Sequence, residues 1–270
     1  MGQEVFRLSE IGYSYGEGHA LKGISFTAVQ GESLGILGAN GSGKSTLLKI
    51  MNGLVFPTSG EMRFSGEAVS EETLKGPFQR CFRERTGFVF PEPDVQLFSP
   101  TVFDEVAFGP LQIQLSEDEV ERRVATLLEM LGIAALKDRP PYTLSSGEKK
   151  KVAIASVLAT NPDVLLLDEP TNGLDPRTQV WLFELLQGLK DLKKTIIMAT
   201  HDLSLVGDLC DRVIVIGEDH GVVADGPADK ILRDKDLLLK ANIIHEHTHR
   251  HGDIIHMHSH GPFGTHDEHE

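Results

Sequence analysis

Residues 38–46 read Gly38-Ala39-Asn40-Gly41-Ser42-Gly43-Lys44-Ser45-Thr46, which fits the pattern G-x-x-x-x-G-K-[ST]. The stretch lies between an apolar run of strand type, 33–37, and a helical pattern that begins at Thr46. Glycines let successive backbone N–H groups curl around an anion, and a helix N-terminus adds partial positive charge there. We therefore expect a phosphate-binding loop of a nucleotide site, with Lys44 on the β- and γ-phosphates and Ser45 on Mg²⁺. A Gly/Ser-rich turn that matches by chance is the alternative.

A second segment supports the nucleotide site independently. Residues 164–169 are four aliphatic residues followed by Asp168 and Glu169. In open α/β sheets, ligands bind at the carboxyl ends of the strands, which is where these two carboxylates are expected. Asp168 would hold Mg²⁺ and Glu169 would act as general base on the attacking water.

The composition narrows the class of protein. The chain has 270 residues, a net charge of −14 and two cysteines without C-x-x-C spacing. Such an acidic chain is a poor partner for nucleic acid or anionic lipid, and its cysteine content fits a reducing compartment. The first residues lack the pattern of a signal peptide, and no apolar run approaches the ~20 residues that span a bilayer. Any membrane association is therefore expected through a membrane protein.

The order of patterns predicts an α/β protein. Residues 4 to about 35 alternate apolar and polar positions, which is typical of an antiparallel β-layer. Strands at 164–168, 195–199 and 213–216, with a helix beginning near Pro176, predict a mostly parallel sheet. Between them lies a more helical insertion at about 97–159. Its Ser116 and Glu119 have capping-box spacing, and Lys149, Lys150 and Lys151 form a charge run that reads as a solvated helix face or as a surface near a phosphate.

The composition changes abruptly after Asn242. Nine of the twelve histidines fall in 243–270: His245, His247, His249, His251, His256, His258, His260, His266 and His269. With few apolar residues to form a core, this segment is expected to be a disordered tail. Neutral imidazoles bind divalent transition metals, so the first seven of these histidines are candidate ligands for Ni²⁺, Co²⁺ or Zn²⁺. A solubilising tail and a cloning remnant remain alternatives.

With Leu144-Ser145-Ser146-Gly147-Glu148 included, residues from about 4 to about 235 resemble the ATP-binding-cassette ATPases. The family signature is Leu-Ser-Gly-Gly-Gln, and this chain keeps Ser145 and Gly147. The resemblance implies the family's P-loop fold, with a mostly parallel core sheet, an antiparallel β-subdomain and a helical subdomain, in a cassette of residues 4–240. It also implies that the signature closes on ATP held by a second cassette. One phosphate loop and one signature per chain therefore imply a head-to-tail homodimer.

Further residues match the family's motifs one at a time. Tyr15 resembles the aromatic residue that stacks on adenine, Asp175 the loop aspartate that communicates across the dimer, and His201 the switch histidine at the γ-phosphate. The family's magnesium-binding glutamine does not carry over, because its position holds Pro91, which has neither a side-chain amide nor a backbone N–H. Gln96, five residues on, or a water molecule is expected to fill that gap.

Residues 93–98, 101–110 and 147–155 resemble the ATPases of energy-coupling-factor importers, and the His-rich tail indicates the cobalt and nickel members. The resemblance implies an ATPase that drives integral membrane subunits from the cytoplasmic face of the membrane, as a peripheral protein importing Ni²⁺ or Co²⁺. Two alternatives stay open. One is an importer ATPase for an organic vitamin. The other is a soluble P-loop metal chaperone or store, although no guanine-reading Asn-Lys-x-Asp motif occurs.

Overall fold

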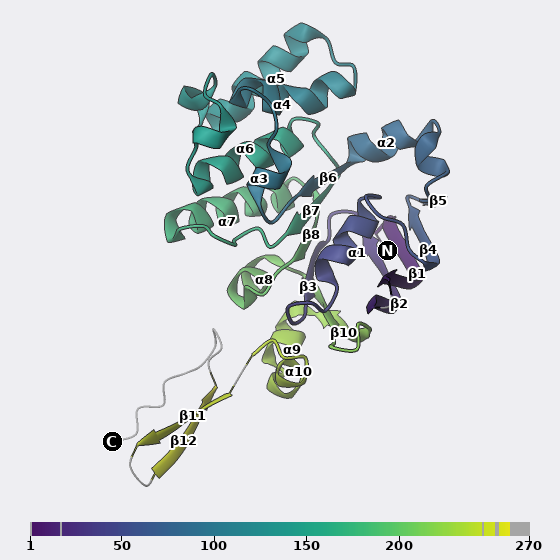
Figure 1. The fold of residues 1–270 in the computed structure, drawn as a ribbon, viewed down its shortest axis with the longest axis vertical. Helices are drawn as coiled ribbons and strands as arrows, with labels where there is room; N and C mark the ends of the chain where they lie inside the picture. Colours follow the sequence, from purple (N-terminus) through teal and green to yellow (C-terminus); the bar gives the residue numbers. More distant parts are fainter. Residues whose placement is uncertain (1, 17, 245, 252–253, 260–270) are drawn as a thin grey trace.

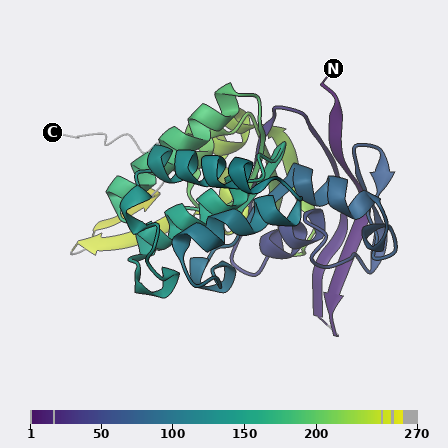
Figure 2. The same ribbon diagram turned by 90° about the horizontal axis from the view of Figure 1, so that it is seen from above.

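A computed structural model describes residues 2–16, 18–244, 246–251 and 254–259, with side chains described as far as Ile244. Two sheets and a group of helices form the body of the molecule (Figure 1). The antiparallel sheet has the order β2-β1-β4-β5 and contains β1 (Glu4–Tyr15), β2 (Gly18–Val29), β4 (Ser59–Phe64) and β5 (Glu67–Ala68). Viewed from above, it lies along one side of the molecule (Figure 2). This is the antiparallel layer that the alternating pattern predicts.

The second sheet has the order β10-β9-β3-β8-β7-β6. Its strands are β3 (Ser33–Leu37), β6 (Thr86–Val89), β7 (Val164–Asp168), β8 (Thr195–Ala199), β9 (Arg212–Ile216) and β10 (Val222–Pro227). All neighbours pair in parallel except β9 and β10. Every residue of β3, β7 and β8 is buried, which explains why these strands read as continuous apolar runs. The prediction of a mostly parallel core sheet is confirmed.

Helices cover the sheets and fill the insertion between β6 and β7. The insertion contains α3 (Pro93–Gln96), α4 (Val102–Gln112), α5 (Glu117–Met130) and α6 (Ser146–Leu158). The other helices are α1 (Lys44–Met51), α2 (Phe78–Arg85), α7 (Pro176–Asp191), α8 (Leu203–Leu209), α9 (Ala228–Arg233) and α10 (Lys235–Lys240). The insertion has its own apolar core, to which α5 contributes Val120, Val124 and Leu128. We propose that about 97–159 of this insertion form the helical subdomain.

Two sequence expectations about helices need correction. The backbone N–H of Glu119 does donate to Ser116, but the Glu119 carboxylate pairs with Arg122 and Arg123. The capping box with both hydrogen bonds lies instead at the start of α6, between Ser145 and Glu148. The lysines on α6 are not a solvated face, since Lys149 pairs with Asp94, Lys150 is fully buried and Lys151 lies 4.6 Å from the ring of Trp181.

The C-terminal segment from residue 243 was expected to be a disordered tail. Ile244 is buried, and Ile243 packs against the same core cluster; both lie beyond residue 240, where the cassette was expected to end. Two strands then form an antiparallel hairpin, β11 (Glu246–His251) and β12 (Ile254–Ser259), which projects away from the body (Figure 1). A polar segment with alternating residue types has the period of a strand, which composition alone did not reveal. We propose that the tail begins after Ile244.

Candidate nucleotide and magnesium site

Three segments meet at the carboxyl edge of the parallel sheet. The phosphate loop follows β3, Asp168 ends β7 and is followed by Glu169, and His201 follows β8. Because β8 lies between β3 and β7, segments more than a hundred residues apart become neighbours. This is the edge at which open α/β sheets bind ligands, as the sequence predicts.

The phosphate loop needs its glycine at position 43. Gly43 has a φ of +108°, which only glycine adopts at low cost, and a Cβ there would collide with the carbonyl oxygen of Ala20. The loop passes directly from Gly43 into α1, which begins at Lys44. The backbone therefore presents the N-terminus of an eight-residue helix at the place where the phosphates are expected.

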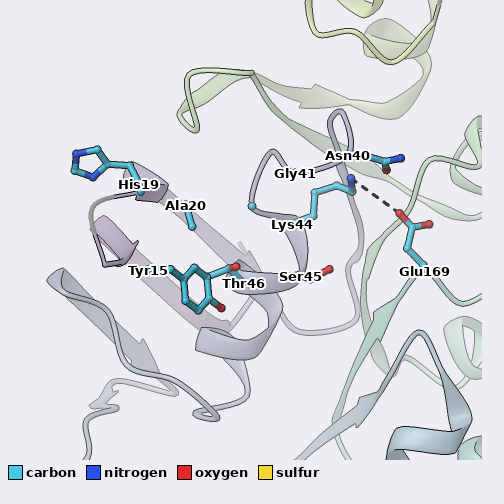
Figure 3. Close-up of a pocket in the computed structure, with 11 residues that line it drawn as sticks. Tyr15, His19, Ala20, Asn40, Gly41, Lys44, Ser45, Thr46 and Glu169 are labelled. Carbon is cyan, nitrogen blue, oxygen red and sulfur yellow. Dashed lines mark ion pairs between the residues drawn. The ribbon is translucent and has the colours of Figure 1, made fainter.

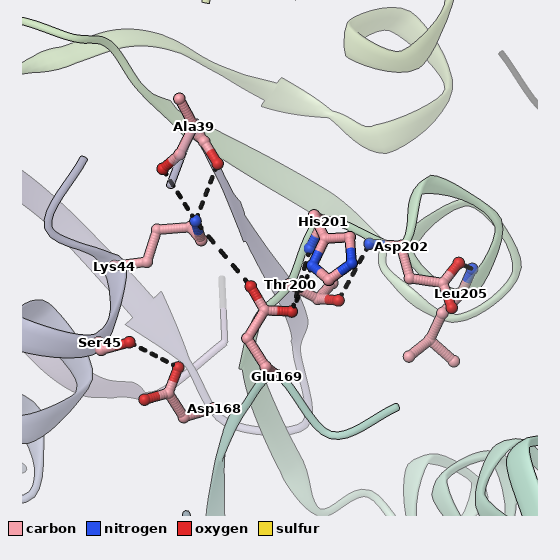
Figure 4. A network of polar contacts seen from close by, with 10 residues as sticks. Ala39, Lys44, Ser45, Asp168, Glu169, Thr200, His201, Asp202 and Leu205 are labelled. Atoms are coloured by element: carbon pink, nitrogen blue, oxygen red, sulfur yellow. Dashed lines mark hydrogen bonds and ion pairs between the residues drawn. The ribbon is translucent and has the colours of Figure 1, made fainter. Parts of the chain in front are cut away.

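Lys44 lies folded back on its own loop. Its Nζ donates to the carbonyl oxygens of Gly38 at 2.8 Å and Ala39 at 3.1 Å, and lies 4.0 Å from Glu169 Oε1 (Figure 4). Burial lowers the pKa of Lys44, and the carboxylates of Glu169 and Asp168 oppose that shift. The ammonium group is thus held at the loop by neutral carbonyls, which a phosphate can replace as a stronger, charged acceptor.

A cavity of about 460 Å³ adjoins the loop (Figure 3). It brings together Asn40, Gly41, Gly43, Lys44, Ser45, Thr46, Tyr15 and Glu169. Tyr15 is 56 % exposed, so its ring is available to an adenine base. The cavity is also lined by Gly18, His19 and Ala20, which the sequence reasoning missed. The glycines that follow Tyr15 in the sequence could have indicated these residues, because a hairpin turn there brings the chain back past the same cavity.

Ser45 and Asp168 form the candidate magnesium site. The Ser45 hydroxyl donates to Asp168 Oδ1 at 2.9 Å, while Oδ2 of the same carboxylate is buried and has no hydrogen-bond partner among the described residues. Burial raises the pKa of Asp168, and the hydrogen bond from Ser45 opposes the shift. A buried carboxylate oxygen without a donor costs free energy unless a cation compensates it. Hydroxyl and carboxylate oxygens are the ligands that Mg²⁺ prefers, so these residues fit the ion.

Glu169 has the geometry expected of a general base. Its Oε2 lies 2.8 Å from Nδ1 of His201 and accepts the backbone N–H of His201 at 3.3 Å (Figure 4). Its φ of +43° is unusual for a residue with a side chain and marks a strained position of the kind found at functional sites. The carboxylate is therefore oriented by His201 on one side and Lys44 on the other. It can accept a proton from a water molecule bound beside the phosphates.

The signature lies apart from this cavity. Ser145, Gly147 and Glu148 line a second cavity of about 490 Å³ together with Asp175 and Thr178. Asp175 caps α7 by accepting the backbone N–H groups of Arg177 and Thr178, and the Thr178 hydroxyl lowers the pKa of Asp175. The family resemblance predicts that Ser145 and Gly147 contact ATP held by a second cassette and that Asp175 acts across the dimer. Within one chain these residues form a surface separate from the nucleotide cavity, and their contact with nucleotide stays a prediction.

Gln96 makes no described hydrogen bond to Ser45 or Asp168. Its Oε1 accepts the backbone N–H of Phe90 at 3.1 Å, and its Nε2 donates to Ala153 O at 2.8 Å and to Ser156 Oγ at 3.3 Å. All of its hydrogen-bonding groups therefore contact the turn after β6 and the helix α6. That Gln96 or a water molecule fills the gap at Pro91 stays a prediction.

The predicted transition-metal ligands were His245, His247, His249, His251, His256, His258 and His260. His245, His260, His266 and His269 lie outside the described residues. Within the hairpin, the strand register pairs His247 with His258 and His249 with His256. Positions that are opposite each other, or two apart on one strand, lie on the same face of a ladder.

Comparisons with known proteins agree with this geometry. Residues 21–172 match the family model described as ABC transporter. The chain is similar to a putative ABC transporter ATP-binding protein of Methanosarcina acetivorans, with 58 % identity over 92 % of each chain. It is also similar to the nickel import ATP-binding protein NikO of Rhodobacter capsulatus, with 43 % identity over 89 % of this chain and 96 % of the relative.

Among solved structures, the chain resembles cbiO1 of Clostridium perfringens, which is described as part of the ABC transporter complex cbiONQ. The TM-score is 0.74 with 40 % identity, over 89 % of this chain and 95 % of that one. No helix within the described ranges has the length and apolar character needed to cross a membrane. The phosphate-loop segment 38–46, the candidate magnesium pair Ser45 and Asp168, and the signature segment 144–148 all lie in the chain that these comparisons cover. The chain therefore belongs to the ABC transporters, as an ATP-binding subunit whose ATP hydrolysis is coupled to transport.

Proposed function

We propose that two copies of this chain form a head-to-tail dimer around two MgATP and drive a membrane importer of nickel or cobalt. The observation that carries the dimer is the separation of the two cavities within one chain. Lys44 and Glu169 line one of them, and Ser145 and Gly147 line the other. A helix N-terminus capped by a serine hydroxyl is a phosphate-binding element, and here it has no phosphate loop of its own chain beside it. A second chain turned head to tail supplies one.

The membrane partner is assigned to a groove on the helical subdomain. A cavity of about 520 Å³ is lined by the apolar side chains Phe103, Ala107, Phe108, Leu111 and Val120, with Asp104, Glu117 and Glu121 among them. Phe98 is 68 % exposed beside Phe108, with the two ring centroids 5.0 Å apart. Exposed aromatic rings with nearby carboxylates complement an amphipathic helix that carries basic residues. We assign this groove to a cytoplasmic helix of an integral membrane subunit, which places the chain on the cytoplasmic face as a peripheral protein.

Two observations support a transition metal as the transported substrate. One relative is named for nickel import. The other is the concentration of histidines at the C-terminus, where the hairpin register places His247, His249, His256 and His258 on one face. Imidazole nitrogens are ligands for divalent ions such as Ni²⁺, Co²⁺ or Zn²⁺. An organic vitamin is the competing substrate, because substrate selection lies in the membrane subunits.

Glu169→Gln tests the dimer. The amide keeps the shape of the side chain but cannot accept the proton, so hydrolysis is expected to fall by about 100-fold or more. ATP then holds the closed dimer, which light scattering detects as a doubled mass with ATP and not with ADP. Glu184→Gln, on the exposed face of α7, is the matched control and stays monomeric after turnover. A Glu169→Gln protein that stays monomeric with ATP contradicts the sandwich.

Cellular metal content tests the substrate. Cells expressing the whole transporter with wild-type chain, Glu169→Gln or Glu184→Gln are analysed for total nickel, cobalt and zinc. We expect nickel or cobalt alone to fall in Glu169→Gln and not in the control. If the cellular content of all three metals is unchanged and vitamin uptake falls, the transported substrate is an organic vitamin.

A further inference from the structure

Lys150 is a fully buried lysine in the first half of α6. Its Nζ donates to the carbonyl oxygen of Pro91 at 2.8 Å and approaches that of Phe90 at 3.3 Å. Both carbonyls belong to the Pro91 turn, defined here as residues 90–92, which follows β6. The ammonium group thus joins α6 to the turn that lies at the end of a core strand.

Gln96 contacts the same turn from another direction. It accepts the backbone N–H of Phe90 and donates to the backbone of α6 at Ala153. Pro91 has no backbone N–H group that would need a hydrogen-bond acceptor. The N–H of Phe90 and the carbonyl groups of Phe90 and Pro91 are therefore all bound by two side chains, Gln96 and Lys150, which both connect the turn to α6.

A lysine at this position is costly for folding. Its described hydrogen bonds reach neutral carbonyl groups only, and a buried ammonium without a contacting carboxylate loses more hydration than such bonds return. In agreement, burial lowers the pKa of Lys150 to about 8, against the opposing effect of the Asp168 carboxylate. A methionine would fill a similar volume without that cost. The neighbouring Lys149 instead pairs with Asp94, whose side chain is 70 % exposed.

The turn and the helix lie on the path between the two functional surfaces. On one side, β6 pairs with β7, whose last residue is Asp168. On the other side, α6 begins at Ser146, directly after the signature serine. A fixed contact between the turn and α6 would transmit a displacement at the magnesium edge to the signature.

We propose that Lys150 is a positioning residue that fastens the Pro91 turn to the signature helix, so that both move as one unit when the dimer closes. This rests on the head-to-tail dimer proposed above. Lys150 contacts neither nucleotide nor metal in this role. It acts by setting where α6 presents Ser145 and Gly147 to the other chain.

The test compares Lys150→Met with Lys149→Met in the full-length chain. The first removes the buried donor and keeps the length of the side chain, and the second removes an exposed ion pair of little energetic value. Hydrolysis is measured per nucleotide-binding site, so that misfolded protein does not count. We expect Lys150→Met to keep the KM for ATP within about twofold and to lose about tenfold or more in kcat, because the lost contacts are hydrogen bonds of a charged group. Lys149→Met should match wild type in both.

Measuring dimer formation with ATP distinguishes a failure of the Lys150 inference from a failure of the proposed dimer. Glu169→Gln should form a dimer with ATP, whereas the double variant Lys150→Met/Glu169→Gln should need about tenfold more ATP to do so. Equal closure and equal kcat per site in Lys150→Met would overturn the role of Lys150 and leave the dimer standing. A Glu169→Gln protein that never dimerises would remove the dimer, and this inference with it.

Hydrogen exchange gives a second measurement that needs no Lys150 variant. In Glu169→Gln, addition of ATP should change the protection of the Phe90 amide and of the first turn of α6 by the same factor, because they move together. Protection that changes in one segment and not in the other would also overturn the proposal. This measurement applies even where Lys150→Met does not fold.

Discussion

At the scale of single residues, the site depends on ionisable side chains that lie within ion-pair or hydrogen-bond distance of one another. Glu169 lies between Lys44 and His201, and its strained backbone fixes the direction of its carboxylate. Lys44 rests on carbonyl groups and Asp168 keeps one carboxylate oxygen unpaired. Of these three groups, Asp168 alone has a buried oxygen without a described partner, and this oxygen could bind Mg²⁺.

Tyr15→Ala should weaken ATP binding. Stacking of an aromatic ring on adenine contributes about 1 kcal/mol, which corresponds to about fivefold in Kd. Tyr15→Phe keeps the ring and should bind within about twofold of wild type. Calorimetric titration of Glu169→Gln protein, which does not consume the ATP, measures both. Equal affinity of Tyr15→Ala and wild type would show that adenine does not lie on this ring.

Lys150 should make the free energy of unfolding depend on pH in the alkaline range. Its pKa is lowered from 10.5 to about 8 in the folded state, so the unfolded chain binds more protons between these values. Stability therefore rises with pH through this window, by up to about 3 kcal/mol if each pKa unit is worth about 1.4 kcal/mol. Urea unfolding of wild type and Lys150→Met across the window isolates the effect as the difference between the two slopes. Parallel slopes would contradict a buried, charged Lys150.

At the scale of secondary structure, α6 carries the signature and is held at several places. Ser145 and Glu148 form the capping box at its start, Lys150 and Gln96 bind the Pro91 turn to its side, and Lys151 donates to Leu131 O while lying over Trp181. These contacts define the orientation of one helix relative to the sheet. The signature is accordingly an element positioned by its surroundings, and its own five residues explain only its local shape.

Glu148→Ala should destabilise the protein by about 1 kcal/mol, because it removes one half of the capping box. Hydrogen bonds from the Ser145 backbone and hydroxyl lower the pKa of Glu148. Its contribution is therefore present above the ordinary carboxyl pKa and is lost as the pH falls through the lower folded value. Glu148→Gln keeps an acceptor and should keep most of the stability without this pH dependence.

The control for the capping box is Glu129→Ala on the exposed face of α5, which should change stability by less than about 0.5 kcal/mol. Urea denaturation at neutral and acidic pH measures all three variants. A Glu148→Ala protein as stable as Glu129→Ala would show that the box contributes nothing in solution.

At the scale of the whole molecule, one chain offers three separate surfaces. The nucleotide cavity and the signature cavity are suited to a second cassette, and the acidic, aromatic groove of the helical subdomain to a membrane subunit. The His-rich hairpin projects from the body beyond α10 (Figure 1). Because the three cavities share no lining residue, the proposed ATP binding, dimer contact and membrane docking can be removed one at a time.

Removal of residues 245–270 should abolish most nickel binding by the purified chain. Ile243 and Ile244 stay, since both pack on the core, so the cassette should fold and hydrolyse ATP within about twofold of the full chain. Replacing His247, His249, His256 and His258 with asparagine is the matched variant that keeps the chain length. Equilibrium dialysis followed by metal analysis provides the measurement. A truncated protein that still binds as much nickel would place the metal elsewhere.

The chemistry of the nucleotide site was predictable because its motifs are local. Residues 38–46 contain the glycines, the lysine and the hydroxyl within nine positions, and Asp168 and Glu169 end an apolar run that reads as a buried strand. The alternation in 4–35 predicted the antiparallel layer, and the strands predicted the parallel sheet. Backbone conformation and strand burial are set by neighbouring residues, so a single sequence is enough to read them.

The positions of Gln96, Lys150 and His19 could not be read in the same way. Gln96 lies five residues from Pro91 but binds α6 near Ala153, and Lys150 stands in a run of lysines that is typical of a solvated surface. Which face of α6 is buried depends on how α3 and α4 pack against it. The local motifs of this chain were enough to predict which chemical groups would bind the phosphates and Mg²⁺. Which charges are buried could be seen only in the folded chain, because burial depends on segments that the fold brings together from distant parts of the chain.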